Sequence, residues 1–207
     1  MSVGILSLLL LSVFLKPSHE LPVYRVLSSF VLLAAMGITL DRLGGSPNFS
    51  TDMIHITKTG LLFSLIVLGA SFLTVWIVPV FSSGFKDLNR PELYTLILLS
   101  SLGMSAMTYS TNLLFIFISL ELASIGFYLL IAMRQSDFFS NEASLKYFIL
   151  GSLASAILLF GMAFYYGATG SLNMAAAFDI QENDTRLYLS LSLLMLFSGF
   201  SFKLRLS

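Results

Sequence analysis

Cysteine is absent from this 207-residue sequence, and charged residues are few. Without cysteine, disulfide bonds, thiolate metal sites and cysteine-ligated iron–sulfur clusters are excluded. Only 11% of the residues are charged and the formal net charge is zero, so no basic face is available and no nucleic-acid partner is expected. The two histidines, His19 and His55, lie near the ends of apolar runs. We interpret them as interfacial residues, which argues against a haem held by two histidines in a bilayer.

Long apolar runs take the place of a charged surface. Hydrophobic residues make up 57% of the sequence, and the mean hydropathy is +0.89. A helix needs about 20 mostly apolar residues to cross a bilayer. The sequence therefore predicts an all-α, polytopic membrane bundle with about seven transmembrane helices. The expected spans are 2–15, 23–40, 59–81, 92–109, 112–133, 142–166 and 187–206.

The connections between these runs are short and rich in proline, glycine and charge, as in "KPSHELP" and "DRLGGSPNFSTD". The fourth and fifth spans are separated only by "YST", which predicts a tight antiparallel hairpin. The longest polar connection, residues 167–185, contains "LNMAAAFDI", for which we expect a short helix on the membrane surface. No polar stretch is long enough to form a separate soluble domain.

Glu121 is an acid within the fifth expected span, "TNLLFIFISLELASIGFYLLIAMR". It lies about 13 Å along the helix axis, so its short side chain reaches neither interface. Intramembrane acids are costly unless paired or hydrated, and they commonly lie on a proton or ion path. Helical spacing places Phe117, Ser124 and Tyr128 on the same face, which predicts a partly hydrated bundle interior. The alternative is a structural acid, neutral or hydrogen-bonded to a neighbouring helix.

Two lysines are candidate partners of Glu121. Lys146 follows Glu142 by four residues, a spacing that favours an interfacial ion pair at the start of the helix. Lys203 lies in the last expected span, beside Arg205 and close to the end of the sequence. From the residues alone, we interpret Lys203 as a terminal basic anchor.

Small residues recur in "GSLASAILLFGMAFYYG", where Gly151 and Ser155 are four apart and Gly161 follows. In lipid, such residues let helix backbones approach each other closely. We interpret this pattern as a general helix–helix contact.

Four motifs follow one another in a specific order: "LEL" around Glu121, "EASLKYFILG", "YGATG" and a late "FK". With the surrounding sequence from Pro91 to Phe202, they resemble the antiporter-like subunits of respiratory complex I, in particular the N-terminal half of chain 2 of NADH:ubiquinone oxidoreductase. These subunits share their outline with membrane subunits of Mrp-type sodium/proton antiporters. The resemblance implies an N-terminal three-helix membrane segment at 1–90, which matches only in kind. It implies that 91–207 is the first half of an antiporter-like proton-translocating repeat.

In that family, a mid-membrane glutamate and lysines on successive helices form a hydrated, charge-coupled proton path. The resemblance implies that Glu121, Lys146 and Lys203 fill these places, with Lys146 facing Glu121 across two helices and each charge tuning its neighbour. It also implies a non-redox subunit of a translocase that holds no cofactor itself. NADH, FMN, iron–sulfur clusters and ubiquinone would be bound elsewhere in the complex. The expected partners are the other complex I membrane subunits and phospholipids, in the mitochondrial inner membrane or else a bacterial or thylakoid membrane.

The sequence departs from the family in its length. Family members continue through a proline-broken helix into a second, inverted set of spans, whereas this sequence ends at Ser207. We therefore expect Lys203 at mid-membrane and a second polypeptide that carries the C-terminal half of chain 2. Two alternatives stay open: a Mrp-type cation/proton antiporter subunit, and a structural membrane subunit with no transport role.

Overall fold

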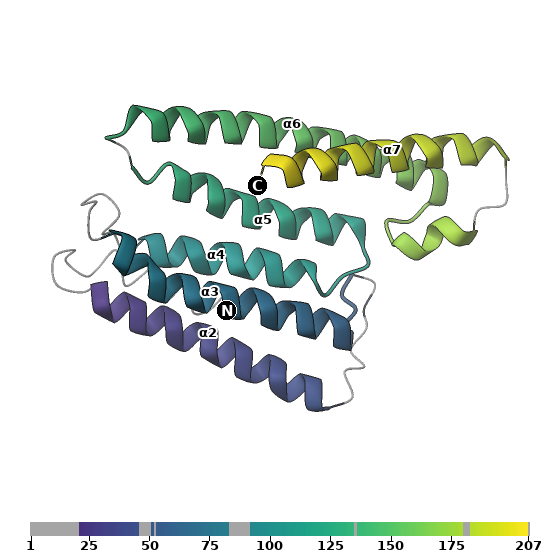
Figure 1. Ribbon diagram of the computed structural model, residues 1–207. Helices are drawn as coiled ribbons and strands as arrows, with labels where there is room; N and C mark the ends of the chain where they lie inside the picture. Colours follow the sequence, from purple (N-terminus) through teal and green to yellow (C-terminus); the bar gives the residue numbers. More distant parts are fainter. Residues whose placement is uncertain are drawn as a thin grey trace.

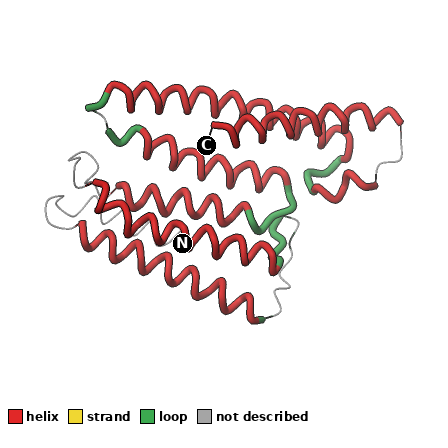
Figure 2. Tube along the Cα trace, viewed as in Figure 1, coloured by secondary structure: helices red, strands yellow, loops and turns green. Residues whose placement is uncertain are grey.

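The computed structural model describes residues 21–45, 51, 53–82, 92–134, 136–179 and 183–206. This part of the chain is built from helices joined by loops (Figure 2), which confirms the all-α prediction. The first expected span, 2–15, lies outside the described residues. The α-helices are α2 (Leu21–Gly44), α3 (Lys58–Ser82), α4 (Glu92–Met107), α5 (Leu113–Ile131), α6 (Phe138–Thr169) and α7 (Asn183–Leu206), with a 3₁₀-helix, η2, at Met174–Asp179.

Five of these helices are long and apolar enough to cross a membrane. The segments that meet this description are Pro22–Gly44, Lys58–Val80, Leu113–Ile131, Phe138–Thr169 and Arg186–Leu204. The remaining one, α4, is a shorter apolar helix of 16 residues. The described part therefore has the composition of an integral membrane protein. Its five candidate spans and one shorter apolar helix come close to the predicted seven spans.

Capping residues extend α6 beyond its predicted bounds of 142–166. A side-chain oxygen of Asp137 accepts a hydrogen bond from the Phe139 amide at 3.1 Å, which starts the helix. Gly170 ends it with a left-handed φ of 69°, a conformation that glycine adopts without strain. Hydropathy marks only the stretch suited to hydrocarbon, whereas caps mark where the helix begins and ends, so the two measures differ.

Consecutive helices run antiparallel, and α7 returns along α6 to end beside the middle of α5 (Figure 1). One core cluster joins α2, α3 and α4 around Leu32, Leu68 and Leu98. A second joins α5, α6 and α7, with Leu158 and Leu196 among its members. The chain therefore packs as two neighbouring helix groups that share the α4–α5 contact.

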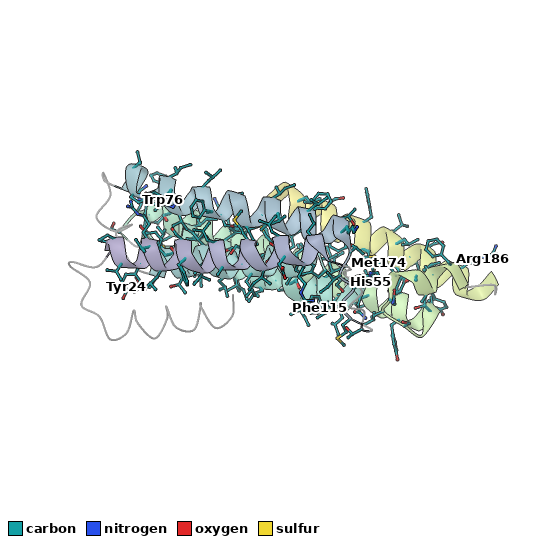
Figure 3. The ribbon with its side chains drawn as sticks, turned by 90° about the horizontal axis from the view of Figure 1, so that it is seen from below. Tyr24, His55, Trp76, Phe115, Met174 and Arg186 are labelled. Carbon is teal, nitrogen blue, oxygen red and sulfur yellow. The ribbon has the colours of Figure 1, made fainter. Side chains whose placement is uncertain are left out.

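At one end of the group formed by α2, α3 and α4, an arginine lies over a tryptophan ring. In α2, the Arg25 guanidinium lies 4.6 Å from the centre of the Trp76 ring of α3. Figure 3 shows Trp76 and Tyr24 at this end of the molecule, far from Arg186 in α7. A cation over an aromatic face is stabilised by the ring quadrupole, so this contact offsets part of the cost of placing Arg25 among apolar helices.

The polar connection after α6 forms the expected short helix, as the 3₁₀-helix η2. The Tyr165 hydroxyl donates to the backbone oxygens of Asn173 and Met174 at 2.9 Å and 3.0 Å. Asn173 also forms an isolated antiparallel bridge with Asn112, immediately before α5. These bonds hold the connection against the start of α5.

The predicted hairpin of α4 and α5 depends on glycine. A methyl group at Gly103 would lie 2.5 Å from the Ala123 amide nitrogen and 2.6 Å from the Ser119 carbonyl oxygen, so the two backbones nearly touch there. Gly126 of α5 is similarly crowded by Ser100 of α4. Close backbone approach of this kind is how helices associate in lipid, where burial of apolar surface provides little drive.

We predict that Gly103→Ala destabilises the protein by about 1–3 kcal/mol, because the added methyl group meets backbone atoms that cannot move independently. The measurement is thermal unfolding of the purified protein in lipid nanodiscs. Gly69→Ala in α3 is the matched control, since a methyl group there meets nothing within 4 Å. Equal melting temperatures for the two variants would contradict the close α4–α5 contact.

Candidate functional site

Glu121 lies near the middle of α5, as its sequence position predicts. The helix begins at Asn112, whose side-chain oxygen accepts hydrogen bonds from the amides of Leu114 at 3.0 Å and Phe115 at 3.4 Å. This cap fixes the start of the helix and therefore the depth of Glu121 within it. The carboxylate consequently lies more than two helical turns from the N-terminal end of α5.

Glu121 pairs with Lys203 across two helices that are distant in sequence. The Lys203 ammonium donates directly to Glu121 Oε1. Ser155 of α6 donates to the same carboxylate oxygen at 2.5 Å, and Lys203 Nζ lies 3.2 Å from Ser155 Oγ. One residue from each of α5, α6 and α7 thus meets in a single cluster, which we call the Glu121 cluster.

The Lys203 side chain is only 10% exposed, and that of Glu121 is 28% exposed. A lone ammonium at this depth would lose its hydration without compensation, and the Glu121 carboxylate supplies that compensation. The interpretation of Lys203 as a terminal basic anchor is therefore wrong. Lys203 is an interior cation that lies beside the middle of α5, as the resemblance implies.

Lys146 occupies a different position from the one expected. Its ammonium pairs with Glu142 at 2.5 Å, and its side chain is 68% exposed. Lys146 and Ser155 are nine residues apart on α6, which is two and a half turns, so they point to opposite sides of the helix. Because Ser155 faces Glu121, Lys146 faces away from it. The expectation that Lys146 faces Glu121 is therefore wrong, and the pairing with Glu142 suggested by their spacing is confirmed.

A cavity of about 420 Å³ lies beside the Glu121 cluster. Lys203 lines it together with Ser124 and Tyr128, while most of its wall is apolar. Phe117, one turn before Glu121, packs against the core cluster of α5, α6 and α7. The face predicted from helical spacing thus does point into the bundle, with the cavity along part of it.

The role of Ser155 and Gly151 at this site is not predicted from the sequence, which marks them only as small residues of a helix contact. Gly151 lacks a side chain where the Tyr128 hydroxyl packs against α6, and Ser155 bonds to Glu121 one turn later. The small-residue spacing identified this face of α6, but spacing does not say which helix the face meets. The interpretation as a general helix contact holds for Gly161, which packs against Leu196 of α7, and is wrong for Ser155.

Among the described residues, no group of three or more histidine, cysteine, aspartate or glutamate side chains is placed to hold a metal ion. The charged groups that meet in the bundle interior are instead one acid and one amine. Such a pair can exchange a proton between its members without changing its total charge. The geometry therefore suits proton transfer, with a hydroxyl to complete the hydrogen bonding.

Comparison with known proteins gives an independent view of this site. The family described as "NADH:quinone oxidoreductase/Mrp antiporter, TM" matches residues 110–207, which include all three residues of the Glu121 cluster. NADH-quinone oxidoreductase subunit N of Leptospira interrogans is 34% identical over 215 residues, covering 100% of this chain and 41% of the relative. The similarity thus extends over the whole chain.

Solved structures agree with this similarity. A chain in the structure of respiratory complex I from Thermus thermophilus with bound aureothin has a TM-score of 0.78 at 30% identity, covering 97% of this chain and 42% of that one. A chain of the Mrp complex from Dietzia sp. has a TM-score of 0.69 at 19% identity, covering 97% and 39%; it shows the shared fold alone. The chain spans about two fifths of the length of these proteins.

We predict that Lys203→Met destabilises the protein by about 3–5 kcal/mol, because Glu121 is left without its partner. The double variant Glu121→Gln with Lys203→Met should be more stable than Lys203→Met alone, since no unpaired charge remains. Thermal unfolding in nanodiscs measures both. Lys146→Met is the control, and loss of its exposed pair should cost at most about 0.5 kcal/mol. Equal effects of Lys203→Met and Lys146→Met would contradict the interior pairing.

Proposed function

We propose that this chain, whose residues 110–207 match the NADH:quinone oxidoreductase/Mrp antiporter family, forms the N-terminal part of an antiporter-like subunit of a proton-pumping NADH:quinone oxidoreductase. Its role is proton translocation through the membrane. The observation that carries the proposal is the interior ion pair of Glu121 and Lys203, joined by Ser155. A charged pair is expensive inside a bilayer, and function is the usual reason for retaining one.

Proton movement in this proposal is a transfer within and out of the pair. When Lys203 gives a proton to Glu121, an N–H bond breaks and an O–H bond forms, so ammonium and carboxylate become amine and acid. Each group's affinity for protons depends on the charge of the other. A change in charge elsewhere in the complex would therefore shift the proton between the two. The cavity that Lys203 helps to line leaves space beside the pair, and most of its wall is apolar.

Lys146 enters the proposal through the family resemblance, as a third proton-carrying group. Its ammonium lies on the far side of α6 from Glu121 and is held by Glu142. It would therefore exchange protons with Glu121 through water or other groups. Its exposure in the isolated chain leaves it available to such groups on neighbouring subunits.

The redox chemistry of the enzyme is proposed to lie outside this chain. The named relatives are subunits of NADH-quinone oxidoreductases, whose reaction needs NADH, quinone and redox cofactors. We propose that those cofactors are held by other subunits, so this chain is a non-redox part of a translocase. Its partners are then the other membrane subunits of the complex, together with phospholipids at its exposed apolar faces.

The chain covers 41–42% of the length of its relatives in Leptospira and Thermus. We propose that a second polypeptide carries the part of the subunit that this chain does not cover, and intact-protein mass spectrometry of the purified complex tests this against one longer chain. The membrane is expected to be an energy-converting one. A mitochondrial inner membrane is the expectation from sequence, and the bacterial origin of these relatives makes a bacterial membrane the competing proposal.

We predict that Glu121→Gln leaves the complex assembled and still oxidising NADH while its proton pumping falls. Glutamine keeps the shape and hydrogen bonding of glutamate but removes the charge that Lys203 needs. The measurement is proton uptake into proteoliposomes that contain the complete complex, with NADH oxidation followed in parallel. The matched control is Glu142→Gln, which neutralises an exposed acid.

Normal pumping in Glu121→Gln, with normal assembly, would instead support the purely structural subunit. Sodium-coupled transport without associated NADH oxidation would support the Mrp-type alternative.

We predict that Lys146→Met lowers proton pumping whereas Glu142→Gln does not. If Lys146 carries protons, its amine is required whether or not Glu142 is charged. If Lys146 serves only to pair with Glu142, removing either member of the pair should have the same small effect. Proton uptake by the complete complex, measured for both variants beside the wild type, decides between these roles.

A further inference from the structure

Ser155 contacts both members of the interior pair and also a backbone carbonyl. Its Oγ lies 2.5 Å from Glu121 Oε1, 2.9 Å from Gly151 O and 3.2 Å from Lys203 Nζ. Ser155 is 8% exposed. Because Ser155 is buried, these protein groups rather than bulk water satisfy its hydroxyl.

The hydroxyl has fewer hydrogens than it has acceptors nearby. Serine offers one O–H hydrogen and two lone pairs, while an ammonium can only donate. With Lys203 protonated, the Ser155 oxygen therefore accepts from Lys203 Nζ. Its single hydrogen can go either to Glu121 or to the carbonyl of Gly151, and the charged carboxylate is the stronger acceptor.

Transfer of the proton changes this preference. Once Lys203 has become an amine and Glu121 an acid, Glu121 carries its own O–H hydrogen and no longer attracts a donor by charge. The Ser155 hydrogen can then turn to Gly151 O, a carbonyl with two lone pairs that can accept it beside the helical amide. In this arrangement the Ser155 oxygen is free to accept from the new acid. Both charge states are left with satisfied hydrogen bonds.

Two buried serines of α4 lack such a choice. Ser105 of α4 donates to Ser101 O at 2.7 Å and Ser100 donates to Leu96 O at 3.0 Å, both within their own helix. A serine bonded in this way satisfies itself and has little effect on a neighbouring charge. Ser155 has the same helical bond to Gly151 O and, in addition, the two charged partners on α5 and α7.

We propose that Ser155 is a positioning residue for proton transfer, whose hydroxyl hydrogen turns between Glu121 and the Gly151 carbonyl as the proton moves between Lys203 and Glu121. This inference rests on the proposed function of the pair. By satisfying the acid in both charge states, Ser155 avoids the penalty of an unpaired buried polar group in either one. A proton can then move in either direction without leaving a buried oxygen unpaired, a cost that would otherwise add to the energy barrier of the transfer.

The test is the variant Ser155→Ala in the complete complex. We expect it to assemble, since alanine is smaller, and to pump about tenfold more slowly, which is the effect of losing one charge-assisted hydrogen bond in the transfer step. Ser155→Thr, which keeps the hydroxyl, should restore pumping. Ser105→Ala is the matched control, because it removes a hydroxyl of similar burial that has no contact with the pair.

An infrared difference spectrum separates this role from simple packing. The carbonyl stretch of protonated Glu121 is identified by its loss in Glu121→Gln, and in Ser155→Ala it should move to higher wavenumber because the acid loses a hydrogen-bond partner. Slow pumping with an unmoved band, and no rescue by threonine, would overturn the inference in favour of packing. If Ser155→Ala fails to assemble, Ser155→Cys, a weaker donor, should pump at an intermediate rate, and wild-type pumping there would overturn the inference.

The proposed function and this inference fail in distinguishable ways. Normal pumping in Ser155→Ala together with impaired pumping in Glu121→Gln would overturn the inference and leave the function standing. Normal pumping in both variants would overturn the proposed function itself.

Discussion

An acid and an amine can share the interior of a membrane bundle only if each offsets the charge of the other. Each alone would cost about 2.5–3.5 kcal/mol or more at the bilayer centre, and as a pair they also need their remaining hydrogen bonds satisfied. Glu121 and Lys203 meet the first condition by pairing directly, and Ser155 adds a hydrogen bond to each of them, so one residue from each of three helices takes part. The positions of α5, α6 and α7 are therefore tied to one another through this cluster.

The surrounding packing serves the same geometry. Gly103 lets α4 lie against the backbone of α5, and Leu158 and Leu196 hold α7 along α6. Because α7 ends beside the middle of α5 (Figure 1), Lys203 reaches the interior from the last turns of its helix. A small shift of any of these helices would separate charges that cannot be left unpaired, so close packing and charge pairing depend on each other.

The sequence predicts some of this site and misses the rest for physical reasons. An acid among apolar residues is conspicuous, so Glu121 and the face of its helix follow from composition and helical spacing. Lys203 looks like a terminal anchor, because only the tertiary position of α7 places that lysine in the interior. Lys146 was expected to face Glu121. Two and a half helical turns separate it from Ser155 on α6, so it lies on the opposite side of the helix and points outward. Ser155 carries no signal of its own, since a serine in a membrane helix commonly bonds to its own backbone.

The central claim is that the Glu121–Lys203 pair exchanges protons rather than only stabilising the bundle. Lys203→Arg separates these roles, because arginine can keep the ion pair but does not release its proton in proteins. The decisive measurement is proton pumping by the complete complex carrying this variant, with assembly and thermal stability recorded alongside. The account predicts an assembled, stable complex that has lost most of its pumping. Pumping at the wild-type rate would contradict it and leave the pair with a structural role.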